Sequence, residues 1–168
     1  MGEGIALIKR IAVFIIISIS VSVMHAQTDQ PLFFAAPVAE VVWYGITPPS
    51  MGLGFALGTE DIVSMGLKGI YTMPFSQNDV TVFEITIFLR IYLPITDTVS
   101  GLFAQLTYGA AIFSADAPVS LPAEGGAFSI GLTAGWRFLL GSRYFAEPYI
   151  RVGYPYYGGA GLCAGVRF

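Results

Sequence analysis

The sequence predicts an all-β protein: a transmembrane eight-stranded antiparallel up-and-down β-barrel preceded by a cleaved signal peptide. Apolar residues alternate with small or polar residues at a period of two through eight segments. The chain is 55% hydrophobic but only 11% charged, which is too apolar for a soluble domain of 168 residues. The number of segments is even, as a bacterial barrel with both chain ends on one side of the membrane requires.

The N-terminal segment is expected to be the signal peptide. Lys9 and Arg10 precede an apolar run over residues 11–23, which is too short to span a bilayer comfortably as a helix. Cleavage is expected after Ala26, and an uncleaved N-terminal anchor is the alternative. The expected division is a signal peptide over 1–26, an N-terminal lead over 27–36 and the barrel over 37–168.

The first four strands are expected at residues 40–46, 51–58, 62–73 and 80–93. The last of these has the clearest alternation, with apolar side chains at its odd positions from Phe83 to Leu93. Its two charged residues, Glu84 and Arg90, share the even positions, as a row of residues facing a polar lumen requires.

The other four strands are expected at residues 101–113, 128–140, 144–154 and 158–168. The longest connection, 114–126, follows the fifth strand, whereas tight turns at 59–61 and 141–143 follow the second and sixth strands. Long loops at one end and short turns at the other are the asymmetry expected of an outer-membrane barrel.

The C-terminal strand has one apolar face and one face of small residues. Leu162, Ala164, Val166 and Phe168 share the apolar face, and Arg167 lies on the other. This tail resembles the closing strand of outer-membrane β-barrels, which commonly ends in phenylalanine. The resemblance implies that these four residues form the signal read by the barrel-assembly machinery.

Residues 37–168 as a whole resemble the small eight-stranded outer-membrane β-barrels of the OmpX and OmpA-membrane-domain type. The resemblance rests on the architecture, the signal peptide and Phe168 rather than on a sequence motif. It implies a location in the bacterial outer membrane, with outer-membrane lipid and the barrel-assembly machinery as partners. It implies no peptidoglycan anchoring, because no OmpA-like periplasmic domain follows, and the surface ligand is unknown.

Seven charged residues are expected inside the barrel, where they must pair because unpaired buried charges are costly: Lys68, Glu84, Arg90, Arg137, Glu147, Arg151 and Arg167. Antiparallel register across the turns predicts an Arg137–Glu147–Arg167 cluster and a Lys68–Glu84 pair. Arg90 and Arg151 have no assigned partner; Glu40, the tyrosines and trapped water are open possibilities.

The function expected from this pattern is an integral outer-membrane protein with a structural or surface-interaction role and a lumen filled by ion-paired side chains. The alternative is a narrow channel or small-solute binder with a basic lumen.

Enzymatic function is not expected, although an unusual histidine-free enzyme is a third possibility. The chain's one histidine, His25, lies in the expected signal peptide, so the mature chain offers no imidazole as general base or zinc ligand. Cys163 is expected to be a small filler in a crowded lumen. No cofactor or metal is expected, and with a net charge of −3 and no basic run, neither is nucleic acid.

Two other folds are weaker explanations. Residues 98–115 are apolar enough to suggest a membrane-spanning helix, but their polar residues lack helical spacing. A secreted lipocalin-like barrel would invert the pattern, with polar residues outside and apolar residues within.

Overall fold

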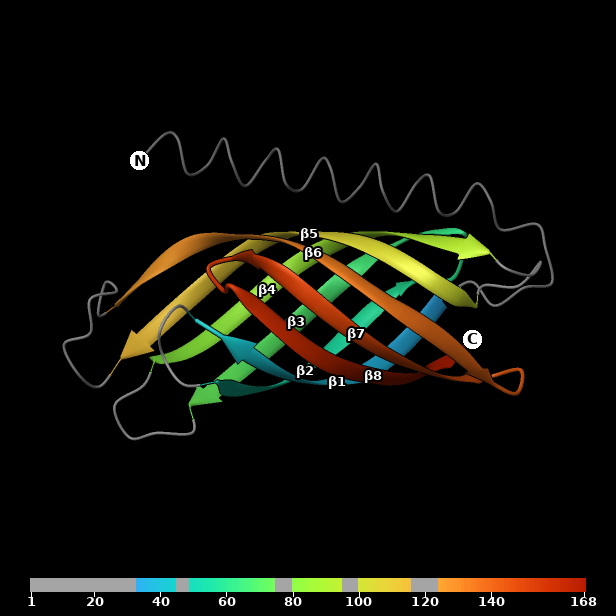
Figure 1. Cartoon of the computed structure of the whole chain (residues 1–168), viewed down its shortest axis with the longest axis horizontal. Coiled ribbons are helices and arrows are strands. Elements are labelled where there is room, and N and C mark those ends of the chain that lie inside the picture. The colour runs from blue at the N-terminus through green and yellow to red at the C-terminus, as the bar shows by residue number, and fades with distance from the viewer. Residues whose placement is uncertain (1–32, 45–48, 75–79, 95–99, 116–123) are drawn as a thin grey trace.

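Eight antiparallel strands form one closed barrel in the computed structural model, which describes residues 33–44, 49–74, 80–94, 100–115 and 124–168 (Figure 1). The strands are β1 (Phe33–Trp43), β2 (Ser50–Thr59), β3 (Val63–Pro74), β4 (Val80–Pro94), β5 (Gly101–Ala115), β6 (Glu124–Leu140), β7 (Tyr144–Tyr154) and β8 (Gly158–Arg167). Each strand pairs with its sequence neighbours, and β8 pairs with β1. The predicted eight-stranded antiparallel topology is therefore confirmed.

The expected signal peptide lies outside the described residues. The described residues contain no helix that is long and apolar enough to cross a membrane.

The first strand begins earlier than the sequence predicted. Phe33 to Ala36, which were assigned to the N-terminal lead, belong to β1, and the strand ends at Trp43 rather than at residue 46. Pro37 lies within β1, although proline has no N–H to donate to a neighbouring strand. It is accommodated at a gap in the ladder, since β1 pairs with β8 at Ala35 and again at Val38 but not between them.

The longest connection is shorter than expected, because both flanking strands extend into it. β5 continues to Ala115, and β6 begins at Glu124 rather than at residue 128. Gly125 pairs with Phe113, and neighbouring residues continue the same ladder, so the backbone hydrogen bonding of the sheet is prolonged at this end.

The strands are strongly tilted, as Figure 1 shows. The strands are staggered relative to one another. Following the paired residues from strand to strand once around the barrel, starting at Phe34, leads back to β1 near Tyr44, about ten residues further along the strand. At eight strands, such a barrel is just wide enough for side chains to fill its interior.

The two faces of the sheet differ as the alternation predicted. Every strand exposes large apolar side chains on the outside, including Leu132 at 60% and Ile150 at 64%. The described side chains that are charged and exposed, Asp61 and Arg143, lie in turns rather than in strands. This apolar outer band with a polar interior is the distribution of a barrel in lipid.

The barrel has two distinct ends, which we name by their connections. The turn end holds the turns after β2 and β6 together with Phe168, and the loop end holds the connections after β1, β3, β5 and β7. The tight β6–β7 turn and the C-terminus lie together at the right of Figure 1. Phe33 and Phe168 exchange two backbone hydrogen bonds of 2.9 Å and complete the seam at the turn end.

Inward-facing glycines allow the tilted strands to approach each other closely. A Cβ added at Gly66 on β3 would overlap the Leu57 carbonyl oxygen of β2 and would lie 2.6 Å from Phe88 Cζ. A Cβ added at Gly69 on the same strand would meet no atom within 4 Å.

We therefore expect Gly66→Ala to destabilise the barrel by about 1–3 kcal/mol, because the clash is with backbone that cannot move aside. Gly69→Ala, the matched control, should unfold at nearly the wild-type urea concentration. Urea unfolding in detergent micelles, followed by tryptophan fluorescence, measures both. Equal midpoints for the two variants would contradict the close approach of β2 and β3.

Candidate functional site

The barrel lumen is the candidate functional site, because nearly all charge in the described part of the strands points into it. Each of the nine charged residues is less than a tenth exposed. The acidic residues are Glu40, Glu60, Glu84 and Glu147, and the basic residues are Lys68, Arg90, Arg137, Arg151 and Arg167. Buried charges at this density must be paired to be tolerated.

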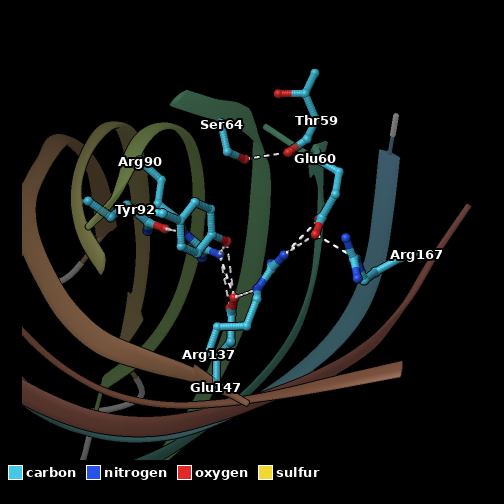
Figure 2. Close-up of polar contacts among 9 residues, drawn as sticks. Thr59, Glu60, Ser64, Arg90, Tyr92, Arg137, Glu147 and Arg167 are labelled. Carbon is cyan, nitrogen blue, oxygen red and sulfur yellow. Dashed lines mark hydrogen bonds and ion pairs between the residues drawn. The ribbon is translucent and has the colours of Figure 1, made fainter. Parts of the chain in front are cut away.

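Five of these residues form one chain of alternating charge at the turn end, in the order Arg90, Glu147, Arg137, Glu60, Arg167 (Figure 2). Arg90 Nη1 lies 2.8 Å from Glu147 Oε1, and Arg137 Nε donates to the same oxygen. Arg137 Nη1 lies 2.6 Å from Glu60 Oε1, and Arg167 Nε lies 2.7 Å from that atom. We call this chain the turn-end network.

Arg137 is the central member of the turn-end network. Figure 2 shows its side chain extending from β6 between Glu147 and Glu60. It therefore joins β6 to β7 and to the turn after β2, across the lumen. One guanidinium can bind two carboxylates in this way because its donors lie in a fixed planar fork.

Aromatic rings surround the arginines of the turn-end network. The Arg137 guanidinium lies 4.1 Å from the centre of the Phe145 ring, and that of Arg90 lies 4.4 Å from the centre of Phe103. Arg90 also donates to the Tyr92 hydroxyl, at 2.7 Å, and the same hydroxyl donates to Glu147 at 3.2 Å. Cation–π contacts and shared hydrogen bonds offset part of the cost of desolvating these cations.

A second alternating chain lies nearer the loop end and runs Lys68, Glu40, Arg151, Glu84. Lys68 Nζ is 3.2 Å from Glu40 Oε2, and Arg151 Nη2 is 3.3 Å from Glu40 Oε1 and 2.8 Å from Glu84 Oε2. We call this chain the central network. Neutral hydroxyls complete it, because Tyr149 donates to Glu40 at 2.7 Å and Ser129 to Glu84 at 2.9 Å.

The Arg137–Glu147–Arg167 cluster predicted from register is correct for Arg137 and Glu147 and wrong for Arg167. The β7–β8 ladder places Glu147 opposite Cys163, so Arg167 lies beyond Tyr144 at the turn end. There it pairs with Glu60, for which the sequence predicted a place in a turn and no ion pair. The even positions of β2 face inward, and continuing that parity to Glu60 could have identified it.

The predicted Lys68–Glu84 pair is wrong. The β3–β4 ladder places Glu84 opposite Ile70, and Lys68 reaches over Ala56 of β2 to Glu40 on β1. Glu84 instead binds Arg151 from the far side of the barrel. Register identifies neighbours within the sheet, whereas side chains in a narrow lumen also meet across it.

Arg90 and Arg151, for which the sequence predicted no specific partner, each have several partners. Arg90 binds Glu147 and Tyr92, and Arg151 binds Glu40 and Glu84. Glu40 and the tyrosines were among the open possibilities, but Glu147 and Glu84 were not considered.

Tyr156 is buried inside the barrel towards the loop end. It lies in the connection after β7 but is only 1% exposed, and it packs in an apolar cluster with Val42, Tyr44 and Phe113. The guanidinium of Arg151 lies 3.6 Å from the centre of its ring. Burial raises the pKa of Tyr44 to about 12 and also raises the pKa of Tyr156, so both phenols are neutral at physiological pH.

A cavity of about 10 Å³ separates the two networks. Its lining includes Lys68 of the central network, Arg90 of the turn-end network, and Thr133 and Cys163. This volume is about what one water molecule needs.

The C-terminal strand presents its residues as predicted. Leu162, Val166 and Phe168 are 50%, 40% and 64% exposed on the outer face, and Ala164 is exposed beside them. Cys163 and Arg167 point inward.

No family model and no curated protein matches the sequence. Among solved structures, the N-terminal β-barrel domain of Pseudomonas aeruginosa OprF is similar, with a TM-score of 0.60 at 15% identity, over 83% of this chain and 98% of that chain. Neisserial surface protein A is also similar, with a TM-score of 0.59 at 11% identity, over 80% of this chain and 94% of that chain. This chain therefore has the fold of the small eight-stranded outer-membrane barrels, as the resemblance implied.

We expect Glu147→Ala to lower the free energy of unfolding by about 3–5 kcal/mol, because it leaves Arg90 and Arg137 without their shared carboxylate. The control, Arg143→Gln, changes an exposed charge in a turn and should cost less than about 0.5 kcal/mol. Thermal and urea unfolding in micelles give both values. Wild-type stability in Glu147→Ala would mean that the network does not hold the barrel together.

The adjacent residues Glu60 and Asp61 offer a second, closely matched comparison. Glu60 is buried against two arginines, whereas Asp61 is exposed. Glu60→Gln should lower the melting temperature by several times as much as Asp61→Asn, because only the first change removes a carboxylate from between two buried cations. Equal melting temperatures in a thermal scan would place Glu60 outside the network.

Proposed function

We propose that the protein is a non-enzymatic, integral protein of the bacterial outer membrane with a structural or surface-interaction role. In this proposal the ion-paired lumen stabilises the barrel, and the loop end meets the outside of the cell. The observation that carries the proposal is the separation of charge: large apolar side chains cover the outside of every strand, while the buried charges alternate in two networks inside.

The geometry of the sheet supports insertion in a bilayer. Hydrocarbon offers no partner for backbone N–H and C=O groups, and a closed barrel satisfies these groups within itself. The strands are 10–17 residues long, enough to cross the apolar layer when tilted. The fold of the OprF and Neisserial surface protein A barrels is consistent with the same compartment.

The proposed partners follow from the outer surface. Outer-membrane lipid would cover the apolar band. The barrel-assembly machinery would recognise the closing strand through the outward residues Leu162, Ala164, Val166 and Phe168. This strand seals the barrel by pairing with β1.

The filled lumen supports a structural role over transport. Between the two networks there is room for about one water molecule, and the buried Tyr156 packs with Val42, Tyr44 and Phe113 towards the loop end. Cations, carboxylates and rings are packed against one another, so a solute would have to break several ion pairs to pass.

Membrane insertion is tested by fractionating the cell envelope and comparing the gel mobility of heated and unheated samples. A folded barrel should partition with the outer membrane and migrate differently before and after heating. Recovery in the soluble fraction without detergent would overturn the proposal.

Planar lipid bilayers test the closed lumen. We expect no steady conductance above the leak of the bare membrane, whereas a 16-stranded porin in the same lipid, the positive control, should conduct. A reproducible single-channel current would instead support the narrow channel. The direction of the reversal potential in a salt gradient would then show whether the excess of bases selects anions.

A further inference from the structure

We propose that the cavity between the two networks binds one small monovalent anion of the halide class. This inference goes beyond the function proposed above and holds in whichever membrane the barrel resides. It rests on three independent features of the cavity: the charge of its walls, an unpartnered hydroxyl and its size.

The first feature is the charge of the lining. The cavity is lined by two cations, Lys68 and Arg90, and no carboxylate is among the described residues that line it. The Gln105 oxygen already accepts from Arg90 Nε at 2.8 Å, so Gln105 has only N–H donors left to offer. A lining that is rich in donors and free of carboxylates favours an anion over a cation.

The way the networks terminate gives the cavity its positive charge. The turn-end network begins and ends with arginine, so it holds one more positive than negative charge, and its inner end is Arg90. The central network ends at Lys68, which lines the same cavity from the neighbouring strand β3. Lys68 uses two of its three N–H donors on Glu40 and Tyr149, which leaves one for a group in the cavity.

The second feature is Thr133 on β6. It is 5% exposed and lines the cavity, and its Oγ1 has no hydrogen-bond partner among the described residues. A buried hydroxyl without a partner costs free energy, so an occupant of the cavity that accepts a hydrogen bond from it would be stabilising.

The third feature is size. The cavity is about 10 Å³, room for one water-sized particle, and a halide ion is only slightly larger. A water molecule would satisfy Thr133 but would not offset the excess charge. Larger oxyanions such as sulfate are not expected to fit, because the cavity has room for little more than one water-sized particle.

Bromide is the direct probe, since its position can be located by anomalous diffraction. Because side chains fill the lumen, the barrel should be refolded in detergent in sodium bromide rather than soaked afterwards. We expect an anomalous peak in the cavity within hydrogen-bond distance of Thr133 Oγ1 and Lys68 Nζ. Electron density there without anomalous signal would identify water and overturn the proposal, as would an empty cavity.

Thermal unfolding provides a second readout. Protein refolded and measured in sodium chloride should melt roughly 2–4 °C higher than in the same concentration of sodium gluconate, whose anion is too large to enter. Equal ionic strength keeps the screening of other ion pairs the same. Identical melting temperatures in the two salts would contradict the site.

Two threonine variants separate this site from general salt effects. Thr133→Val removes the hydroxyl from the cavity and should reduce the chloride-dependent shift by at least half. Thr107→Val also removes a buried hydroxyl, one that donates to the Gly131 carbonyl at 3.2 Å outside the cavity, and should retain the full shift. Equal loss in both variants would overturn the proposal. If Thr133→Val does not fold, the bromide structure of the wild type decides alone.

Discussion

The contact between Arg137 and its two carboxylates is the interaction on which the interior depends. Arg137 is completely buried, and it binds Glu147 on one side and Glu60 on the other. A lone guanidinium in that position would carry a large desolvation cost. The alternating order of the whole turn-end network follows from this constraint, because each of its carboxylates lies between two arginines and pairs with both.

The closed sheet and the paired charges of the lumen both satisfy polar groups without bulk water: the sheet satisfies the backbone, and the ion pairs satisfy the inward side chains. Hydrocarbon accepts no unpaired backbone group, so the strands satisfy one another around a full circuit. A barrel of this size leaves an interior too narrow for bulk water, so the polar side chains that alternation directs inward must satisfy one another as well. Glycines such as Gly66 permit the close strand approach that this small, tilted barrel requires.

The sequence predicted which charged side chains face the lumen, but not which of them pair with one another. Parity alone placed Lys68, Glu84, Arg90, Arg137, Glu147, Arg151 and Arg167 in the lumen, and all seven lie there. Their partners depend on contacts across the barrel, such as Arg151 with Glu84, that pairing between adjacent strands does not describe. Glu60 was overlooked because its inward direction depends on how the β2 strand continues into the turn.

The sequence by itself determined the alternation, the number of strands and which side chains face inward, because these follow from the two-residue period of a strand and a single boundary between lipid and lumen. Only the tertiary structure decided the beginning of β1 at Phe33, the stagger of the ladders, the burial of Tyr156 and the pairing of the charges. These features depend on where the sheet closes and how far each strand is displaced against the next. Such a displacement changes which charges meet while leaving every side chain on the same face.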